Sequence, residues 1–205
     1  MILFGGTFDP IHKGHTAVAT FSLKYIGAEK IIFIPAKRSV LKALSPHAAD
    51  ADRLKMIFMA VAGNQNFEVS DYELTKPGAS YTIETVKYFQ EKFGNDTMLY
   101  WLVGADSVND LPYWYKIIEL LDTCELAIMY RDVFAAPDFS KFENTWGIER
   151  IQKLQRNIIP TPLVPISSTK IREAIAAGDD VSDMLAPKVA DYIRQNCLYQ
   201  PSRKV

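Results

Sequence analysis

The first fifteen residues concentrate groups that suit the binding of an anion. The stretch "ILFGGTFDPIHKGH" holds three glycines and two of the three histidines of the 205-residue chain, His12 and His15. Gly5 and Gly6 lack the Cβ atoms that would hold a ligand away from the main chain. A helix that begins around Gly14 would aim its free N–H groups and positive dipole end over this loop, which suits phosphate. We therefore predict that both imidazoles reach one phosphate, as hydrogen-bond donors and, when protonated, as positive charges.

Each part of this stretch also has an ordinary interpretation. Tight turns use Gly-Gly routinely, and two histidines three residues apart also occur as zinc ligands. No cysteine or third histidine lies nearby, and His47 stands in a proline-containing loop. We therefore expect no metal held by the protein itself. The combination of a strand, a Gly-Gly turn and H-x-G-H at a helix start is much more specific than any one of its parts.

A second polar group stands near the C-terminal end of the chain. Ser167, Ser168 and Thr169 precede a helical pattern, where hydroxyls usually cap free N–H groups. Arg172 lies three residues beyond Thr169, so the two side chains share one helix face. A guanidinium aimed past a helix N-terminus suits a phosphate. Capping and phosphate binding are both open for these hydroxyls.

Short apolar runs alternate with longer amphipathic patterns along the chain. We expect strands at 1–4, 30–35, 67–70, 97–106 and 124–131, and a proline-broken extended segment at 157–166. Helices are expected at 15–27, 52–63, 80–94, 112–122, 167–178 and 186–196, with a helical excursion within 132–157. In the second helix, the i, i+3, i+4, i+7 spacing predicts a buried face made of Leu54, Ile57, Phe58 and Val61.

This alternation predicts a single α/β domain over residues 1–205, with helices on both faces of a parallel sheet and a C-terminal helical part from about 167. Ligands of such sheets bind beyond the carboxyl ends of the strands. Gly5 and Gly6 end the first predicted strand, and Gly104 and Asp106 end the central one. The sequence therefore predicts one site at this edge of the sheet.

The overall composition favours small-molecule ligands. The net charge of −1 shows no basic excess of the kind that polynucleotide binders carry. No apolar run approaches the ~18 residues that span a bilayer, and no leader pattern opens the chain, so we expect a cytoplasmic protein without membrane contact. Cys124 and Cys197 match no metal or redox spacing and are predicted to be buried structural thiols.

Several segments resemble one enzyme family. "GGTFDPIHKGH" and "ISSTKIR" resemble the H-x-G-H and I-S-S-T-x-x-R motifs of the nucleotidyltransferase superfamily. More narrowly, "GASYTIETV", "LVGADSVNDLPYWYKIIELL" and "MLAPKVADYIRQNCLY" resemble segments of bacterial nicotinate-nucleotide adenylyltransferases, in that family's order. The resemblance covers almost the whole chain and is poorest at about 132–157. It implies a Rossmann-like, doubly wound fold, and it leaves self-association into a homo-oligomer open.

The resemblance also implies a reaction and the residues that serve it. The adenylyl group of ATP, accompanied by Mg²⁺, would pass to nicotinate mononucleotide by direct in-line attack, giving deamido-NAD and pyrophosphate without a covalent enzyme intermediate. The implied catalytic residues are His12, His15, Lys42 and Arg172. The implied ATP-binding residues are Gly5, Gly6, Thr7, Phe8, His15, Gly104, Asp106, Ser167, Ser168, Thr169 and Arg172. The implied mononucleotide-binding residues are Thr82, Ile83, Trp114, Tyr115 and Arg131.

Some of the residues implied for ATP binding and for mononucleotide binding also have a purely structural interpretation. Asp106 is suited to capping a short helix as well as to ribose hydroxyls, and aromatic residues such as Trp114 and Tyr115 are more often core than ligand-binding. Arg131, at a strand end, either binds a phosphate or only extends its side chain from the edge of the strand. The resemblance favours the ligand-binding interpretation for Asp106 and for Trp114.

The chain departs from the family at residues 36–42. Members commonly show Asn after "IP" and then Pro-Pro-His-Lys, whereas this chain has Ala36 and then "KRSVLK". Lys42 aligns with the motif's lysine, and His47 does not take the place of the motif's histidine. Nicotinate and nicotinamide mononucleotide therefore both stay open as acceptors. The alternatives are another H-x-G-H enzyme, such as a phosphopantetheine adenylyltransferase, and a non-catalytic nucleotide sensor.

Overall fold

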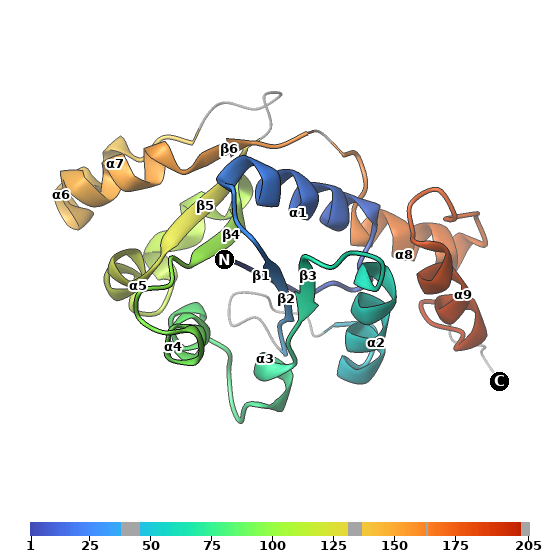
Figure 1. Ribbon diagram of the computed structural model, residues 1–205. Coiled ribbons are helices and arrows are strands. Elements are labelled where there is room, and N and C mark those ends of the chain that lie inside the picture. Colours follow the sequence, from blue (N-terminus) through green and yellow to red (C-terminus); the bar gives the residue numbers. More distant parts are fainter. Residues whose placement is uncertain (38–45, 131–136, 163, 202–205) are drawn as a thin grey trace.

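The structure, a computed structural model, describes residues 1–37, 46–130, 137–162 and 164–201 and is built on a six-stranded, all-parallel sheet (Figure 1). The strand order is β3-β2-β1-β4-β5-β6, so the chain winds outward in one direction from β1 and then returns to wind in the other. The strands are β1 (Ile2–Gly6), β2 (Ile31–Pro35), β3 (Phe67–Val69), β4 (Tyr100–Gly104), β5 (Glu125–Tyr130) and β6 (Ile158–Pro160).

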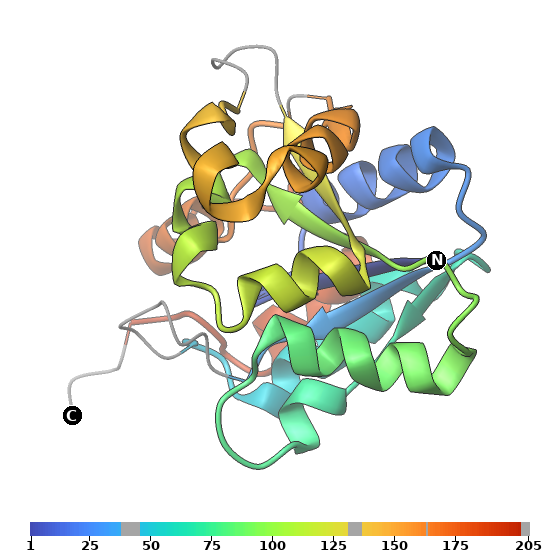
Figure 2. The same ribbon diagram turned by 90° about the vertical axis from the view of Figure 1, so that its left-hand side faces the viewer.

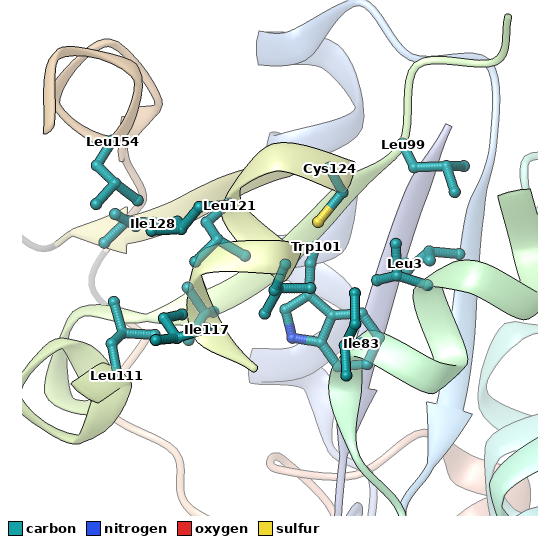
Figure 3. Packing of buried hydrophobic residues seen from close by; sticks show 14 of the residues in the cluster. Leu3, Ile83, Leu99, Trp101, Leu111, Ile117, Leu121, Cys124, Ile128 and Leu154 are labelled. Atoms are coloured by element: carbon teal, nitrogen blue, oxygen red, sulfur yellow. The ribbon is translucent and has the colours of Figure 1, made fainter. Parts of the chain in front are cut away.

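Alternate residues of the inner strands point to opposite faces and divide the core into two layers. The first hydrophobic cluster takes Leu3 and Trp101 from the strands and packs them against α4 (Thr82–Phe93), α5 (Ile117–Thr123) and α7 (Ile148–Arg156), as the close view in Figure 3 shows in part. The second cluster takes Ile2, Phe4 and Leu102 and packs them against α1 (Lys13–Ile26), α2 (Asp50–Val61), α8 (Ser168–Ala177) and α9 (Pro187–Gln195). Helices cover both faces, as the doubly wound fold requires.

The shorter elements complete the two layers. A 3-10 helix (Ala105–Tyr113) follows β4, and α3 (Tyr72–Thr75) precedes α4. The described part of 132–157 is helical, as predicted, with a short 3-10 turn (Ser140–Phe142), α6 (Glu143–Trp146) and α7. Figure 2 shows α4 and α5 in front of the strands. None of the helices found in the described ranges is long and apolar enough to cross a membrane.

The buried face of α2 differs from the prediction. Its buried residues are Arg53, Met56, Ile57 and Val61, whereas Leu54 is only half-buried and Phe58 is 51% exposed. The Arg53 guanidinium donates to the carbonyls of Thr7 (2.6 Å) and Ala36 (2.8 Å). These bonds turn the helix so that position 53, rather than 54, faces the sheet.

Two further sequence predictions are wrong. The segment 112–122 does not form one helix, because Pro112 lies in the 3-10 helix, Lys116 adopts a left-handed φ of 52°, and α5 begins only at Ile117. Trp114 and Tyr115 therefore stand between helices. Cys124 is buried, and its burial raises the pKa of the thiol to about 12, but Cys197 is exposed just after α9.

Candidate functional site

Two cavities meet at the carboxyl end of β1, where the winding direction reverses. The ladder between β1 and β4 consists of two pairs, Ile2 with Tyr100 and Leu3 with Trp101. Ligands of open α/β sheets bind in the crevice at such a switch point. The larger cavity has a volume of about 810 Å³ and the smaller about 230 Å³. Both are lined by Phe4, Gly5, Gly6, Thr7, Ala36, Gly104 and Met129.

The larger cavity gathers residues that lie more than 160 positions apart in the chain. Every residue predicted for ATP binding lines it, together with His12. These residues are Gly5, Gly6, Thr7, Phe8, His15, Gly104, Asp106, Ser167, Ser168, Thr169 and Arg172.

The smaller cavity holds three of the residues predicted for the mononucleotide: Thr82, Trp114 and Tyr115. The Ile83 side chain lies in the first hydrophobic cluster instead, so only its backbone is available there. The ring of Tyr115 lies 4.6 Å from that of Tyr81, measured between centroids. The Trp114 indole nitrogen is buried with no partner among the described residues. Lys42 and Arg131 lie outside the described residues.

The glycines of the first motif admit aromatic rings of the protein itself. A Cβ on Gly5 would lie 2.3 Å from the Trp101 ring, and one on Gly6 would lie 2.9 Å from the Phe8 ring. A Cβ on Gly14 would lie 2.9 Å from Nδ1 of His12. The sequence predicts that Gly5 and Gly6 make room for a ligand; in the structure they also make room for these two rings, which themselves line the cavities.

His12 and His15 stack at the start of α1. His12 precedes the first turn in extended backbone, and its ring lies 3.7 Å from that of His15, nearly parallel to it. The backbone N–H of His12 donates to Nδ1 of His15 (3.3 Å), so a neutral His15 carries its proton on Nε2. Nδ1 of His12 is buried without a partner among the described residues. Both residues line the larger cavity.

Burial keeps the two imidazoles neutral at neutral pH. Burial lowers the pKa of His12 to about 4. Burial, and then the charge of His12, hold the pKa of His15 well below its usual range. The predicted positive charge is therefore absent until an anion enters, since a nearby negative charge raises the pKa of an imidazole.

The start of α8 is bonded to the loop of the first motif. Ser168 donates to the carbonyl of Pro10 (2.9 Å), and Arg172 donates to the carbonyl of Asp9 (2.7 Å) and to the Thr169 hydroxyl (3.3 Å). Ser167 caps the helix, because its hydroxyl accepts from the backbone N–H of Lys170 (3.3 Å). Capping and placement at the cavity wall thus coexist, divided among neighbouring side chains.

Two buried charges that sequence reasoning missed hold the site together. The Asp9 carboxylate accepts from the backbone N–H groups of His47 (2.7 Å) and Ala48 (3.1 Å) and from the Tyr199 hydroxyl (2.7 Å). Burial, together with the Asp9 carboxylate, raises the pKa of Tyr199. Arg53 ties the β1–α1 loop to the end of β2 through its two carbonyl partners. The sequence signal for Asp9 was its place in "FDP"; nothing in the spacing distinguishes Arg53 from Lys55.

Glu73, a buried carboxylate at the smaller cavity, was also missed. It lines the cavity, is 4% exposed and accepts from the Thr85 hydroxyl (2.7 Å). Burial raises its pKa, against the opposing hydrogen bonds of Thr85 and Ser80. Among the described residues, no three His, Cys, Asp or Glu side chains converge to hold a metal ion.

Comparison with known proteins gives a consistent result. A family model described as cytidylyltransferase-like matches residues 3–174. A protein of Methylacidiphilum infernorum named "Probable nicotinate-nucleotide adenylyltransferase" is 35% identical over 205 residues, covering 100% of this chain and 94% of the relative. One of the same name from Neisseria meningitidis is 36% identical over 198 residues and covers 97% of both chains.

Solved structures share the fold. The nicotinic acid mononucleotide adenylyltransferase of Plasmodium falciparum, complexed with NaAD, superposes with a TM-score of 0.70 at 19% identity. The superposition covers 97% of this chain and 96% of the other. A second structure of the Plasmodium protein, complexed with APC, gives a TM-score of 0.68.

Proposed function

This chain belongs to the nicotinate-nucleotide adenylyltransferases of the cytidylyltransferase-like family, and we propose that it transfers the adenylyl group of ATP to nicotinate mononucleotide, giving deamido-NAD and pyrophosphate. It is a nucleotidyltransferase that serves NAD biosynthesis. The observation that carries the proposal is the meeting of the two cavities over Gly5, Gly6 and Gly104. ATP in the larger cavity and the mononucleotide in the smaller one would face each other there.

The reaction needs alignment and charge stabilisation rather than a protein nucleophile. An oxygen of the mononucleotide phosphate attacks the α-phosphorus of ATP, a new P–O bond forms, and the bond to the β-phosphate oxygen breaks as pyrophosphate leaves. Holding the two substrates side by side removes much of the entropic barrier, and fixed donors stabilise the charge that develops. No serine, cysteine or aspartate is required to form a covalent bond.

The residues of the two motifs bind the phosphate groups of ATP in this proposal. The Nε2–H of His15 and the guanidinium of Arg172 are donors at the cavity wall, and α1 directs its positive dipole end toward the same space. His12 lines the same cavity beside His15. Asp106, by the family resemblance, accepts from the ribose hydroxyls. Lys42 stays a candidate by resemblance alone.

The acceptor pocket suits a flat ring that carries an anion. Trp114 and Tyr115 offer aromatic surfaces, and such rings stack on a pyridine. Thr82 begins α4, a twelve-residue helix whose first N–H groups receive no side-chain cap from Tyr81. Uncapped N–H groups at a helix start favour a carboxylate over a neutral amide. This supports nicotinate rather than nicotinamide mononucleotide, although Ala36 stands where relatives commonly carry Asn.

Mg²⁺ is proposed to enter with ATP. Mg²⁺ commonly keeps several waters and binds substrate phosphates with one or two carboxylates, so it needs no protein cage. Asp106, a carboxylate that lines the cavity, fits that mode of binding. When bound, the ion would neutralise phosphate charge.

We also propose that the enzyme works in the cytoplasm as a single domain. Light scattering tests whether it self-associates into a homo-oligomer.

Release of pyrophosphate with different acceptors tests the proposal. ATP and Mg²⁺ are supplied with nicotinate mononucleotide, nicotinamide mononucleotide or phosphopantetheine, each in a separate reaction. We expect strong preference for nicotinate mononucleotide. Preference for nicotinamide mononucleotide would mean that the altered 36–42 segment had shifted the choice of acceptor. Release only with phosphopantetheine would contradict the proposed acceptor, and binding of ATP without release from any acceptor would indicate a sensor.

A further inference from the structure

His47 lies at the larger cavity, although it has no counterpart in the motifs described above. It stands three residues before α2, and with Pro46 it lines the cavity that also holds His12, His15 and Arg172. Its side chain is 56% exposed, so the ring is open to whatever fills that space.

The Asp9 carboxylate holds His47 in one orientation. Oδ2 of Asp9 accepts from the backbone N–H of His47 (2.7 Å) and lies 3.3 Å from Nδ1 of its ring. A carboxylate at Nδ1 favours the ring form that carries a proton on that nitrogen, which leaves Nε2 for a second interaction. Asp9 thereby orients His47 through its carboxylate and Arg172 through its carbonyl (2.7 Å).

The charge of the larger cavity leaves room for another cation. Among the described residues that line it, Arg172 is the one arginine or lysine, while Asp9 and Asp106 are carboxylates. His12 and His15 are neutral at neutral pH, because burial lowers the pKa of both. A triphosphate therefore meets few fixed positive charges there.

We propose that His47 is a substrate-binding residue that contacts the pyrophosphate portion of ATP. Between these two anions, its ring donates from Nδ1 to Asp9 and from Nε2 to a phosphate oxygen. Charge-assisted hydrogen bonds of this kind are the stronger ones. His47 thus adds a hydrogen-bond donor at the leaving group. This inference rests on the proposed function, since it assigns a residue to the leaving group of that reaction.

Two substitutions separate contact with the substrate from support of the loop. In His47→Asn, the amide can still donate to Asp9 but nothing replaces Nε2. In His47→Gln, the amide reaches toward the place of Nε2 without carrying charge. We expect His47→Asn to raise the KM for ATP and the inhibition constant of pyrophosphate by about five- to thirtyfold. His47→Gln should give a smaller rise, and the KM for the mononucleotide should change little in both.

Tyr199→Phe is the matched control. It removes another donor to Asp9 but no group that lines the cavity. We expect it to lower the Tm while leaving the affinity for pyrophosphate unchanged. Calorimetric titration with magnesium pyrophosphate measures that affinity without turnover, and thermal unfolding of each variant monitors the fold.

The outcomes distinguish this inference from the proposed function. If His47→Asn binds pyrophosphate as the wild type does, and only its Tm falls, His47 has a structural role and the inference is wrong. If the wild type releases no pyrophosphate with any acceptor, the proposed reaction fails, while the titrations still report on His47. A wild type that does not bind pyrophosphate at all would overturn the inference as well.

Discussion

His12 and His15 face opposite demands before and after ATP enters. His12 is buried and His15 is half-buried, and their ring centroids lie 3.7 Å apart. Two adjacent imidazolium ions would repel each other there, which is why the charge of His12 helps to lower the pKa of His15. The anion supplies the missing opposite charge. The two histidines therefore gain positive charge only by binding protons when an anion is present, whereas the Arg172 guanidinium in the same cavity is already charged.

The lowered pKa values predict how stability depends on pH. Between pH 6.5 and about 4 the unfolded chain binds more protons at His12 than the folded chain does, so stability falls as the pH is lowered through this window. Glu73, whose pKa is raised, acts in the opposite direction. His12→Asn isolates the histidine, because Asn also suits the residue that precedes a helix. Urea denaturation at pH 7 and 5.5 should show that the wild type loses about 1 kcal/mol more than the variant. Equal losses would contradict the lowered pKa.

His15→Ala tests the donor at the centre of the first motif. Removal of the Nε2–H donor should lower kcat by well over tenfold, because donors aimed at the charge that develops act mainly in the transition state. The far-UV circular dichroism should not change. Thr20→Ala, on the exposed face of the same helix, serves as the control and should keep the wild-type kcat. Near-normal turnover in His15→Ala would refute the role assigned to this residue.

Residues in motifs could be predicted from the sequence, whereas residues that act through the backbone could not. The H-x-G-H motif and the spacing of Thr169 and Arg172 were enough to predict that these side chains line one cavity. Arg53 escaped notice because its partners are carbonyl groups, which leave no trace in the sequence. Cys197 was misplaced because an apolar residue type near a helix end does not reveal which side of the chain it faces.

At the scale of elements, a short ladder and a large ring shape the crevice. β1 and β4 pair only at their first residues, and the Trp101 ring lies against Gly5 near the end of β1. Both strands could be predicted from their apolar runs, and so could the glycines at their ends, Gly5 and Gly6 in β1 and Gly104 in β4. It could not predict the packing of Trp101 on Gly5, because that contact joins strands almost a hundred residues apart.

Gly5→Ala tests this packing. The added Cβ would approach the Trp101 ring to 2.3 Å, so either the ring or the strand must shift. Overpacking of this kind should lower the free energy of unfolding by about 1–3 kcal/mol. Gly63→Ala is the control, because a Cβ there meets no atom within 4 Å. It should change stability by less than about 0.5 kcal/mol. If urea denaturation gave the two variants equal stability, the Trp101 ring would move aside without lowering the free energy of unfolding.

At the scale of the whole molecule, the C-terminal helices close the second core layer. Ile171 of α8 and Val189 and Ile193 of α9 belong to the second hydrophobic cluster. Arg172 and Tyr199 then bind Asp9, in the loop that follows β1. The first and last parts of the chain thus share both core and hydrogen bonds. One domain over residues 1–205 stays a prediction, and this sharing supports it.

Two probes on opposite layers test whether the molecule unfolds as one unit. Trp101 and Trp146 belong to the first cluster and Trp114 packs against it, so tryptophan fluorescence reports on that layer. A dye on Cys197 reports on the end of α9. Cys124 should stay unlabelled, because it is buried and its pKa of about 12 keeps it a thiol.

For a single cooperative domain, the two urea transitions coincide in midpoint and slope. An earlier transition at Cys197 would mean that α9 unfolds apart from the sheet. The Asp9–Tyr199 bond would then be too weak to join the end of the chain to the site.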